Sequence, residues 1–223
     1  MHRIVLIEPI RSRAHGKDGG GESRNPARGR VRVLLDDGES FVLSSSKALS
    51  LGMEQGEDLS EETYGEILQS LYKACMQRCG ILLGSRDYSE QRMREKLRDA
   101  GYPGSVVDNA VEKLRKAGYL DDRRFAQSYV RSHMRDRSRL RIMRDLAEKG
   151  ISEPVIEEAF AAVGEEENVD DAQKEQVLGL LRKRGFDPGA ASYEERQKTM
   201  AFLHRKGYPA DLIRRLTEGG EDW

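Results

Sequence analysis

The sequence of 223 residues predicts a mainly α fold, in which tandem three-helix modules, similar to helix-turn-helix units, form an elongated array behind a small N-terminal β-rich domain. Three observations predict this fold. The first sixty residues hold the β-rich runs, a helix-stop signal recurs from residue 88 onward, and charged residues make up 35% of the chain against 6% aromatics. That composition suits helices with solvated faces. Short helix triplets bury little apolar surface alone, so neighbouring modules should stack.

The N-terminal domain is expected over residues 1–59. Its β-rich runs are "RIVLIEPI" and "RVRVLL", and the Asp-Gly pair at residues 37 and 38 after the second run is a hairpin signal. The Gly-rich, charged stretch at 14–29 predicts a flexible loop. A sheet of two or three strands is marginal alone. It should therefore pack on a connecting helix at 60–86, which Ser60 can cap.

Helix stops repeat along the rest of the chain as Leu-x-x-x-Gly followed by a large apolar residue. Glycine at such a position adopts the left-handed conformation without strain, and the apolar residue folds back onto the preceding turn. The three equivalent stops are spaced by 49 and 57 residues, which fits three short helices with their turns. The stop glycines are Gly101, Gly150 and Gly207, with further stops at Gly118 and Gly185. We expect modules at 87–136, 137–186 and, shorter, 187–223.

The stretch "GYLDDRRF" admits two interpretations. In one, two adjacent carboxylates form a catalytic pair; in the other, the stretch is a helix corner with Asp121 as N-cap and Asp122 at the positive end of the helix dipole. Acid–base catalysis needs a further positioned group and a pocket, and the sequence indicates neither. The corner is favoured. Its residues are Gly118, Tyr119, Leu120, Asp121, Asp122 and Phe125.

Arginines concentrate on the helix after that corner and on the next helix. Arg124, Arg131 and Arg135 fall within about 40° of one another at 100° per residue, on a different face from Phe125 and Tyr129. Between residues 123 and 144 a single carboxylate, that of Asp136, opposes them. Arginine offers multiple donors and a permanent charge to a polyanion or an acidic protein groove. The candidate binding residues are Arg124, Arg131, Arg135, Arg137, Arg139, Arg141 and Arg144.

The net charge of −1 conceals an uneven distribution. Residues 86–144 hold 16 Lys or Arg against 9 Asp or Glu, whereas the stretch 164–171 is acidic. A basic block is commonly only a solvated surface, but the scarcity of acidic neighbours around the arginines favours a binding role.

Enzymatic and metal chemistry find little support. The chain contains no phosphate-binding loop of the G-x-x-x-x-G-K-[ST] type, no G-x-S-x-G elbow and no H-E-x-x-H motif. Two cysteines, Cys75 and Cys79, and four scattered histidines do not supply zinc-ligand spacing. We therefore expect no catalytic residue, no metal and no cofactor. Because the sequence also has no run of about 18 apolar residues and no secretory signal pattern, a cytoplasmic protein is expected.

Several segments resemble the RecX family, the regulatory proteins of the RecA recombinase. The resemblance is carried by "SEQRMREKLRDAGY", "VEKLRKAGYLDDRRFAQSYVRSHM", "MRDLAEKGISEPVIEEAF" and "RQKTMAFLHRKGYPADLIRRL", and it spans the chain from residue 81 to the end. It implies a non-enzymatic modulator whose modules lie in the groove of the RecA filament on single-stranded DNA, with possible direct DNA contact.

The resemblance further implies that binding mainly inhibits ATP hydrolysis, strand exchange and co-protease activity, and so tempers recombinational repair and the SOS response. A monomer is expected. Two alternatives remain: a DNA-binding protein that acts without RecA, because short helix triplets are similar to helix-turn-helix units, and a scaffold that binds neither.

Overall fold

The structure is a computed structural model that describes residues 2–10, 29–166 and 169–218. Its internal contacts divide the chain into two units, Met1–Leu120 and Asp121–Trp223. The predicted loop at 14–29 lies outside the described residues, apart from Gly29. No helix within the described ranges combines the length and the apolar character needed to cross a membrane.

The first unit begins with a four-stranded antiparallel sheet rather than the two or three strands expected. Its strands are β1 (His2–Ile10), β2 (Arg30–Leu35), β3 (Ser40–Ser44) and β4 (Asp58–Leu59), in the order β3-β2-β1-β4. The predicted hairpin is confirmed, since β2 and β3 pair in register from Leu34 opposite Ser40, and Gly38 takes a φ of 83° in the turn. The short β4 was missed because two residues carry too little pattern to indicate a strand.

Two helices follow the hairpin, α1 (Ser45–Ser50) and α2 (Glu61–Leu83). The predicted cap of the second helix is confirmed: Ser60 Oγ accepts a hydrogen bond from the Thr63 N–H at 3.1 Å. One face of α2 buries Ile67, Leu71 and both cysteines. The face packs into the core that also contains the inward side chains of the sheet, including Phe41.

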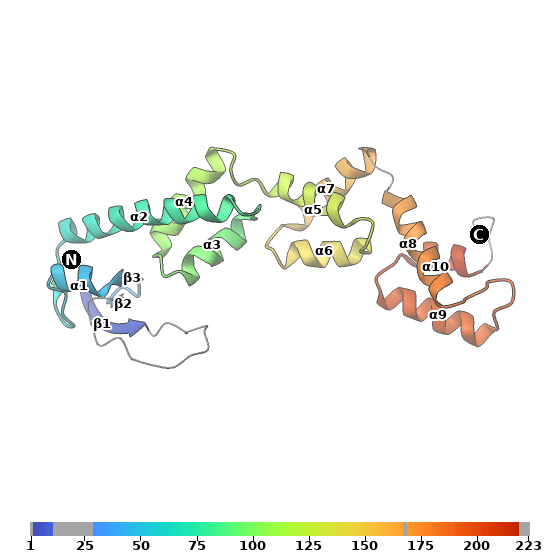
Figure 1. Ribbon diagram of the computed structural model, residues 1–223, viewed down its shortest axis with the longest axis horizontal. Coiled ribbons are helices and arrows are strands. Elements are labelled where there is room, and N and C mark those ends of the chain that lie inside the picture. The colour runs from blue at the N-terminus through green and yellow to red at the C-terminus, as the bar shows by residue number, and fades with distance from the viewer. Residues whose placement is uncertain (1, 11–28, 167–168, 219–223) are drawn as a thin grey trace, which may run out of the picture. The chain divides into compact units, whose positions relative to one another are not determined.

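The first unit is completed by α3 (Glu90–Asp99) and α4 (Gly104–Lys116), which pack beside α2 on the same core (Figure 1). The turn between them closes the outer edge of β3, because the Val42 N–H donates to the Gly101 carbonyl at 3.0 Å. Arg30 Nη2 also donates to the carbonyl of Ala100 at 2.8 Å. A Cβ on Gly101 would run into the Val42 side chain, so this approach requires glycine.

The second unit contains six helices in two groups within its described residues (Figure 1). The α5–α7 triplet comprises α5 (Asp122–His133), α6 (Arg139–Ala147) and α7 (Glu153–Glu166), around a core that includes Val130, Leu146 and Phe160. The α8–α10 triplet comprises α8 (Val169–Lys183), α9 (Tyr193–Arg205) and α10 (Ala210–Thr217), around a second core that includes Leu203 and Ile213.

The recurring helix stops have the predicted geometry. In each, the glycine has a positive φ and the next N–H donates to the carbonyl five residues back, as from Tyr208 to Leu203 at 3.3 Å. The predicted role of Tyr119 needs correction, because its side chain is 64% exposed while Leu120 is buried. The Leu120 N–H also reaches the Leu114 carbonyl, at 3.4 Å, so the chain turns one residue further before its apolar side chain enters the core.

The grouping of helices differs from the module boundaries expected at 136 and 186. Helix α5 shares its core with α6 and α7, not with α3 and α4, and α8 shares its core with α9 and α10. The three equivalent stops, at Gly101, Gly150 and Gly207, mark the ends of α3, α6 and α9, which are the middle helices of their triplets. Repeated stops give the period of the array, but a shared apolar core decides which helix begins each triplet.

Candidate polyanion-binding surface

The corner before α5 is built as the sequence predicts. Asp121 accepts hydrogen bonds from the N–H groups of Arg123 and Arg124, both at 3.0 Å, and Asp122 lies in the first turn. A carboxylate that satisfies the first free N–H groups of a helix acts as an N-cap. The corner therefore fixes where α5 begins, and with it the direction in which the arginines of that helix lie.

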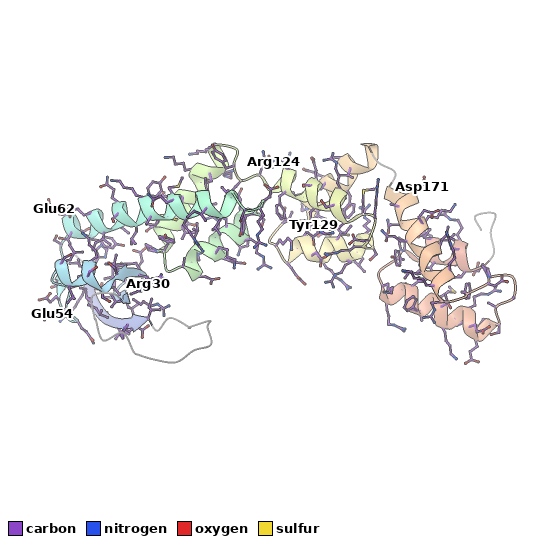
Figure 2. All side chains as sticks on the ribbon, in the orientation of Figure 1. Arg30, Glu54, Glu62, Arg124, Tyr129 and Asp171 are labelled. Carbon is purple, nitrogen blue, oxygen red and sulfur yellow. The ribbon has the colours of Figure 1, made fainter. Side chains whose placement is uncertain are left out.

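The seven predicted arginines occupy α5, α6 and the short link between them. Four are exposed, namely Arg124, Arg135, Arg141 and Arg144, and three are half-buried, namely Arg131, Arg137 and Arg139. Figure 2 shows Arg124 near the start of α5 and Tyr129 on the part of α5 next to α6. Phe125 and Tyr129 pack partly buried against the core of the triplet, as expected from their spacing. Some of these arginines form ion pairs within the triplet, and some line a surface hollow.

A buried carboxylate, that of Asp145, holds two of these arginines. Arg137 Nη1 lies 2.5 Å from Asp145 Oδ2, and Arg141 Nε lies 3.0 Å from Asp145 Oδ1. Tyr129 joins the cluster: its hydroxyl accepts from Arg137 Nη1 at 2.8 Å and donates to Asp145 Oδ2 at 3.3 Å. The network gives both guanidinium groups a fixed position beside the end of α5.

The pKa of Asp145 shows which influence prevails in this cluster. Burial acts to raise the pKa, but the hydrogen bond from Arg137, the charges of Arg141 and Arg137 and the hydrogen bond from Tyr129 together lower it below its usual value. A carboxyl group surrounded by cationic donors favours its charged form. Asp145 is therefore an ion at neutral pH and compensates part of the positive charge of its neighbours.

Acidic side chains of α7 pair with another part of the arginine set. Arg139 Nη2 lies 2.5 Å from Glu157 Oε2, and its guanidinium lies 4.4 Å from the centre of the Phe160 ring. Arg123, outside the predicted set, pairs with Glu158 at 3.3 Å. These contacts hold α7 beside α5 and α6. Arg139 thus has a structural role within the triplet, in addition to the binding role predicted from sequence.

Three of the predicted arginines, Arg137, Arg141 and Arg144, line a surface hollow of about 290 Å³ together with Arg205 and Lys206. We call this site the junction hollow; Asp136, Ser138, Leu140, Gly207 and Tyr208 complete its lining. Arg124, Arg131, Arg135 and Arg139 do not line it. Arg205 and Lys206 were not predicted from the sequence because they lie more than sixty residues from the other arginines. The available signal was the "LHRKG" stop, which carries two adjacent cations directly before its glycine.

The two cysteines are part of the core. Both side chains are fully buried on α2. The hydrogen bond with Cys79 and burial raise the pKa of the Cys75 thiol, so Cys75 stays protonated at neutral pH. Their contribution is apolar packing of α2 against the rest of the first unit.

The strand ends of the first unit bring three possible metal ligands together, although none was expected from the sequence. Ligand atoms of His2, Asp36 and Asp37 lie within 4.8 Å of one another. Each already has a partner: His2 Nδ1 lies 3.1 Å from Asp37 Oδ2, and Asp36 Oδ1 accepts from the Arg3 N–H at 3.0 Å. These hydrogen bonds account for the cluster as a joint between β1 and the β2–β3 turn, and we assign it no metal.

The fold and the basic surface define a class of protein. It is a chain in which a small antiparallel sheet is followed by tandem three-helix domains, and the second triplet carries an arginine-rich face. Three family descriptions match along this chain in order. They are the first, second and third three-helix domains of RecX, at residues 75–114, 121–159 and 171–217. The chain therefore belongs to the RecX family.

Curated relatives and solved structures agree with this assignment. Regulatory protein RecX of Trichlorobacter lovleyi is 33% identical over 141 residues, which cover 61% of this chain and 89% of the relative. Regulatory protein RecX of Clostridium perfringens is 26% identical over 195 residues, covering 84% of this chain and 90% of the relative. A crystal structure of regulatory protein RecX superposes with a TM-score of 0.59 at 22% identity, covering 98% of this chain and 99% of that one, which shows a shared fold.

Proposed function

We propose that this chain is a regulator of the RecA recombinase that binds RecA and its filaments on single-stranded DNA, lies in the filament groove and mainly inhibits them. Its effects are on ATP hydrolysis, strand exchange and co-protease activity, and through them on recombinational DNA repair and the SOS response. Membership of a family whose relatives are named regulatory proteins is the observation that carries the proposal. The chain acts in the cytoplasm as a monomer, without cofactor or catalysis.

The seven predicted arginines of α5, α6 and the link between them supply the electrostatic part of the contact. Four of the seven are exposed, and an arginine keeps its charge at any physiological pH. The two held by Asp145 are positioned before a partner arrives, which reduces the entropy lost on binding. A filament with acidic protein surface and DNA phosphates offers both kinds of anion that such a face can bind.

ATP hydrolysis by RecA on single-stranded DNA tests the proposal. The protein is titrated at ratios well below one per RecA protomer and is also assayed alone. Inhibition at these ratios, without hydrolysis by the protein itself, is expected. If RecA hydrolyses ATP at an unchanged rate at every ratio, the proposal is wrong.

A charge-reversal variant tests the arginine face. Arg131→Glu with Arg135→Glu should weaken the inhibition roughly ten-fold or more, because two cations become anions on the contact surface. Arg182→Glu with Lys183→Glu is the matched control, since these two residues are exposed on α8 and are not among the predicted binding residues. Equal inhibition by the two variants and the parent would contradict the assignment of the face, and circular dichroism checks that both variants keep their helices.

The second candidate is a DNA-binding protein that acts without RecA, which the cationic lining of the junction hollow favours. It predicts duplex binding with a steep salt dependence in the absence of any partner protein. Tight duplex binding combined with no effect on RecA would replace the first candidate by this one.

A further inference from the structure

The junction hollow lies where two helix triplets of the second unit meet. One wall belongs to the link before α6 and to α6 itself, with Arg137, Arg141 and Arg144. The other wall is the end of α9, with Arg205, and the turn that follows it, with Lys206. Residues from 136 to 144 thus share a site with residues from 205 to 208, and neither triplet forms the hollow alone.

Direct contacts hold the two walls together. Ser138 is 3% exposed, and its Oγ donates to the Lys206 carbonyl at 2.7 Å. Gly207 has a φ of 87°, and a Cβ there would lie 3.0 Å from Leu140 Cβ, so the turn rests directly on α6. This close fit makes the hollow a defined concave site between the triplets.

Gln176 of α8 joins the same two triplets behind the hollow. Its Nε2 donates to the Met134 carbonyl at 2.5 Å, and its Oε1 accepts from the Tyr208 hydroxyl at 3.0 Å. One amide side chain therefore connects the end of α5 to the turn after α9, at Tyr208. The docking depends on paired polar groups as well as on apolar contact.

The charge of the hollow is strongly unbalanced. Five cationic side chains line it, and the nearby carboxylates are Asp136 in the lining and Asp145, which pairs with Arg137 and Arg141. Five cations against these two carboxylates leave a formal excess of three positive charges. Because like charges repel across such a small space, an anion that enters relieves a repulsion that the docked triplets otherwise carry.

A phosphate group of a nucleic-acid backbone has the chemistry that fits this site. Its oxygens accept several hydrogen bonds at once from guanidinium forks, and Lys206 adds a compact charge. The volume of about 290 Å³ suits one or two phosphate groups, and the site opens to solvent on the exposed side chains of Arg205 and Lys206. A repeating phosphodiester backbone can pass such a site and remain in solution on both sides.

We propose that the junction hollow binds a phosphate group of single-stranded nucleic acid and that the bound phosphate holds the α8–α10 triplet docked on the α5–α7 triplet. The inference rests on the proposed function in taking nucleic acid as the polyanion, and it assigns the DNA contact to Arg205 and Lys206, together with Arg137, Arg141 and Arg144. Binding and docking are coupled because the ligand contacts both walls.

Binding of a fluorescently labelled single-stranded oligothymidylate to the full chain, without RecA, tests the site by anisotropy at several salt concentrations. Arg205→Gln with Lys206→Gln should weaken binding roughly ten-fold. It should also reduce the salt slope by up to about 0.7, because one phosphate neutralised on a single strand contributes about 0.7. The variant keeps the Lys206 backbone carbonyl that Ser138 contacts. Arg182→Gln with Lys183→Gln, the same residue types on exposed positions of α8, should bind like the parent.

Hydrogen exchange tests the coupling. The oligothymidylate should slow exchange of the backbone amides at 206–208 in the parent and leave those of the Arg205→Gln, Lys206→Gln variant unchanged. Exchange at these amides that the oligothymidylate does not alter in the parent would overturn the docking part of the proposal.

Several results would overturn the site itself: no oligothymidylate binding by the parent, equal binding by the two double variants, or displacement of the oligothymidylate by polyglutamate as effective as by unlabelled oligothymidylate. RecA inhibition is measured separately. If Arg205→Gln with Lys206→Gln abolishes inhibition but keeps oligothymidylate binding, the hollow contacts protein and this inference fails. If the parent binds oligothymidylate through the hollow but leaves RecA unaffected, the proposed function fails and this inference stands.

Discussion

Asp145 sets the arrangement of the arginine face from inside the second unit. Its side chain is 7% exposed, whereas those of its partners Arg137 and Arg141 are 35% and 61% exposed. A buried carboxylate with hydrogen-bonding partners is stable, but the loss of its charge would leave the two cations without their nearest compensation. The residue therefore links the stability of the α5–α7 triplet to the position of two predicted binding residues.

Replacing Asp145 by Asn should lower the free energy of unfolding by about 1–3 kcal/mol, less than for a fully buried pair because both arginines are partly solvated. Urea unfolding at neutral pH measures the change. Asp136→Asn is the control: that carboxylate is exposed, and its replacement should cost no more than about 0.5 kcal/mol. Equal losses in the two variants would contradict the role given to Asp145.

The parent and the Asp145→Asn variant should also differ in how their free energy of unfolding depends on pH. The pKa of Asp145 is lowered in the folded state, so its stabilising contribution is complete above the unfolded value of about 3.9 and is lost as the pH falls through the folded value. The difference in stability between the parent and Asp145→Asn should therefore narrow as the pH falls below about 4. A difference that stays constant down to pH 2 would show that the charge of Asp145 is not its source.

The turn between α9 and α10 depends on Gly207 for two reasons. The residue has a left-handed backbone, and a Cβ there would lie 3.0 Å from Leu140 Cβ and from Ser138 Oγ, closer than ordinary van der Waals contact. Gly185 ends α8 with a similar φ of 62°, but a methyl group at that position would meet no atom within 4 Å. Comparison of the two positions therefore separates the free-energy cost of a left-handed backbone from the cost of contact with α6.

Gly207→Ala should destabilise the protein by about 1–2 kcal/mol more than Gly185→Ala, because a left-handed alanine costs about 1–2 kcal/mol in both variants and only Gly207→Ala adds an overpacked contact with Leu140 and Ser138. Thermal unfolding of the two variants measures the difference. Equal destabilisation would show that the turn and α6 do not press on each other at this point.

Much of the helical structure follows from short sequence signals. Ser60 and Asp121 cap the helices that they were predicted to cap, and the stop glycines end their helices with the expected backbone conformation. These features are local, since a cap or a stop involves neighbours within five or six residues. The exposed Tyr119 shows the limit: the signal located the stop but did not determine which of two adjacent apolar residues enters the core.

The interaction surface was only partly predictable. Helical spacing placed the arginines on common faces, but it did not show that Asp145 pairs with two of them or that Glu157 pairs with Arg139. These partners come from other turns or other helices, and only the packed triplet brings them together. Arg205 and Lys206 reach the junction hollow through docking between triplets, for which a local pattern contains no information.

Each hydrophobic core of the molecule lies within one of the two units. One core cluster contains buried residues from Ile4 to Leu120, and the other two contain buried residues from Ala126 to Leu216. No cluster among the described residues crosses from one unit into the other. Each unit therefore has its own apolar interior, as an independently folding domain requires.

Residues 121–223 alone should fold cooperatively with helical circular dichroism, because the two cores of this unit remain complete. Chemical-shift dispersion and a single unfolding transition of the fragment, compared with the full chain, measure this. A fragment without dispersed signals would show that the second unit needs residues 1–120 to fold.

The turn between α3 and α4 has a consequence for solubility. By accepting the Val42 N–H, the Gly101 carbonyl occupies a position that a strand of another molecule would otherwise use. Exposed strand edges promote edge-to-edge aggregation, and β3 is an outer strand of its sheet. The helical part of the first unit thus covers this position of the β3 edge, and a truncated chain that ends before residue 101 would leave the Val42 N–H open to a strand of another molecule.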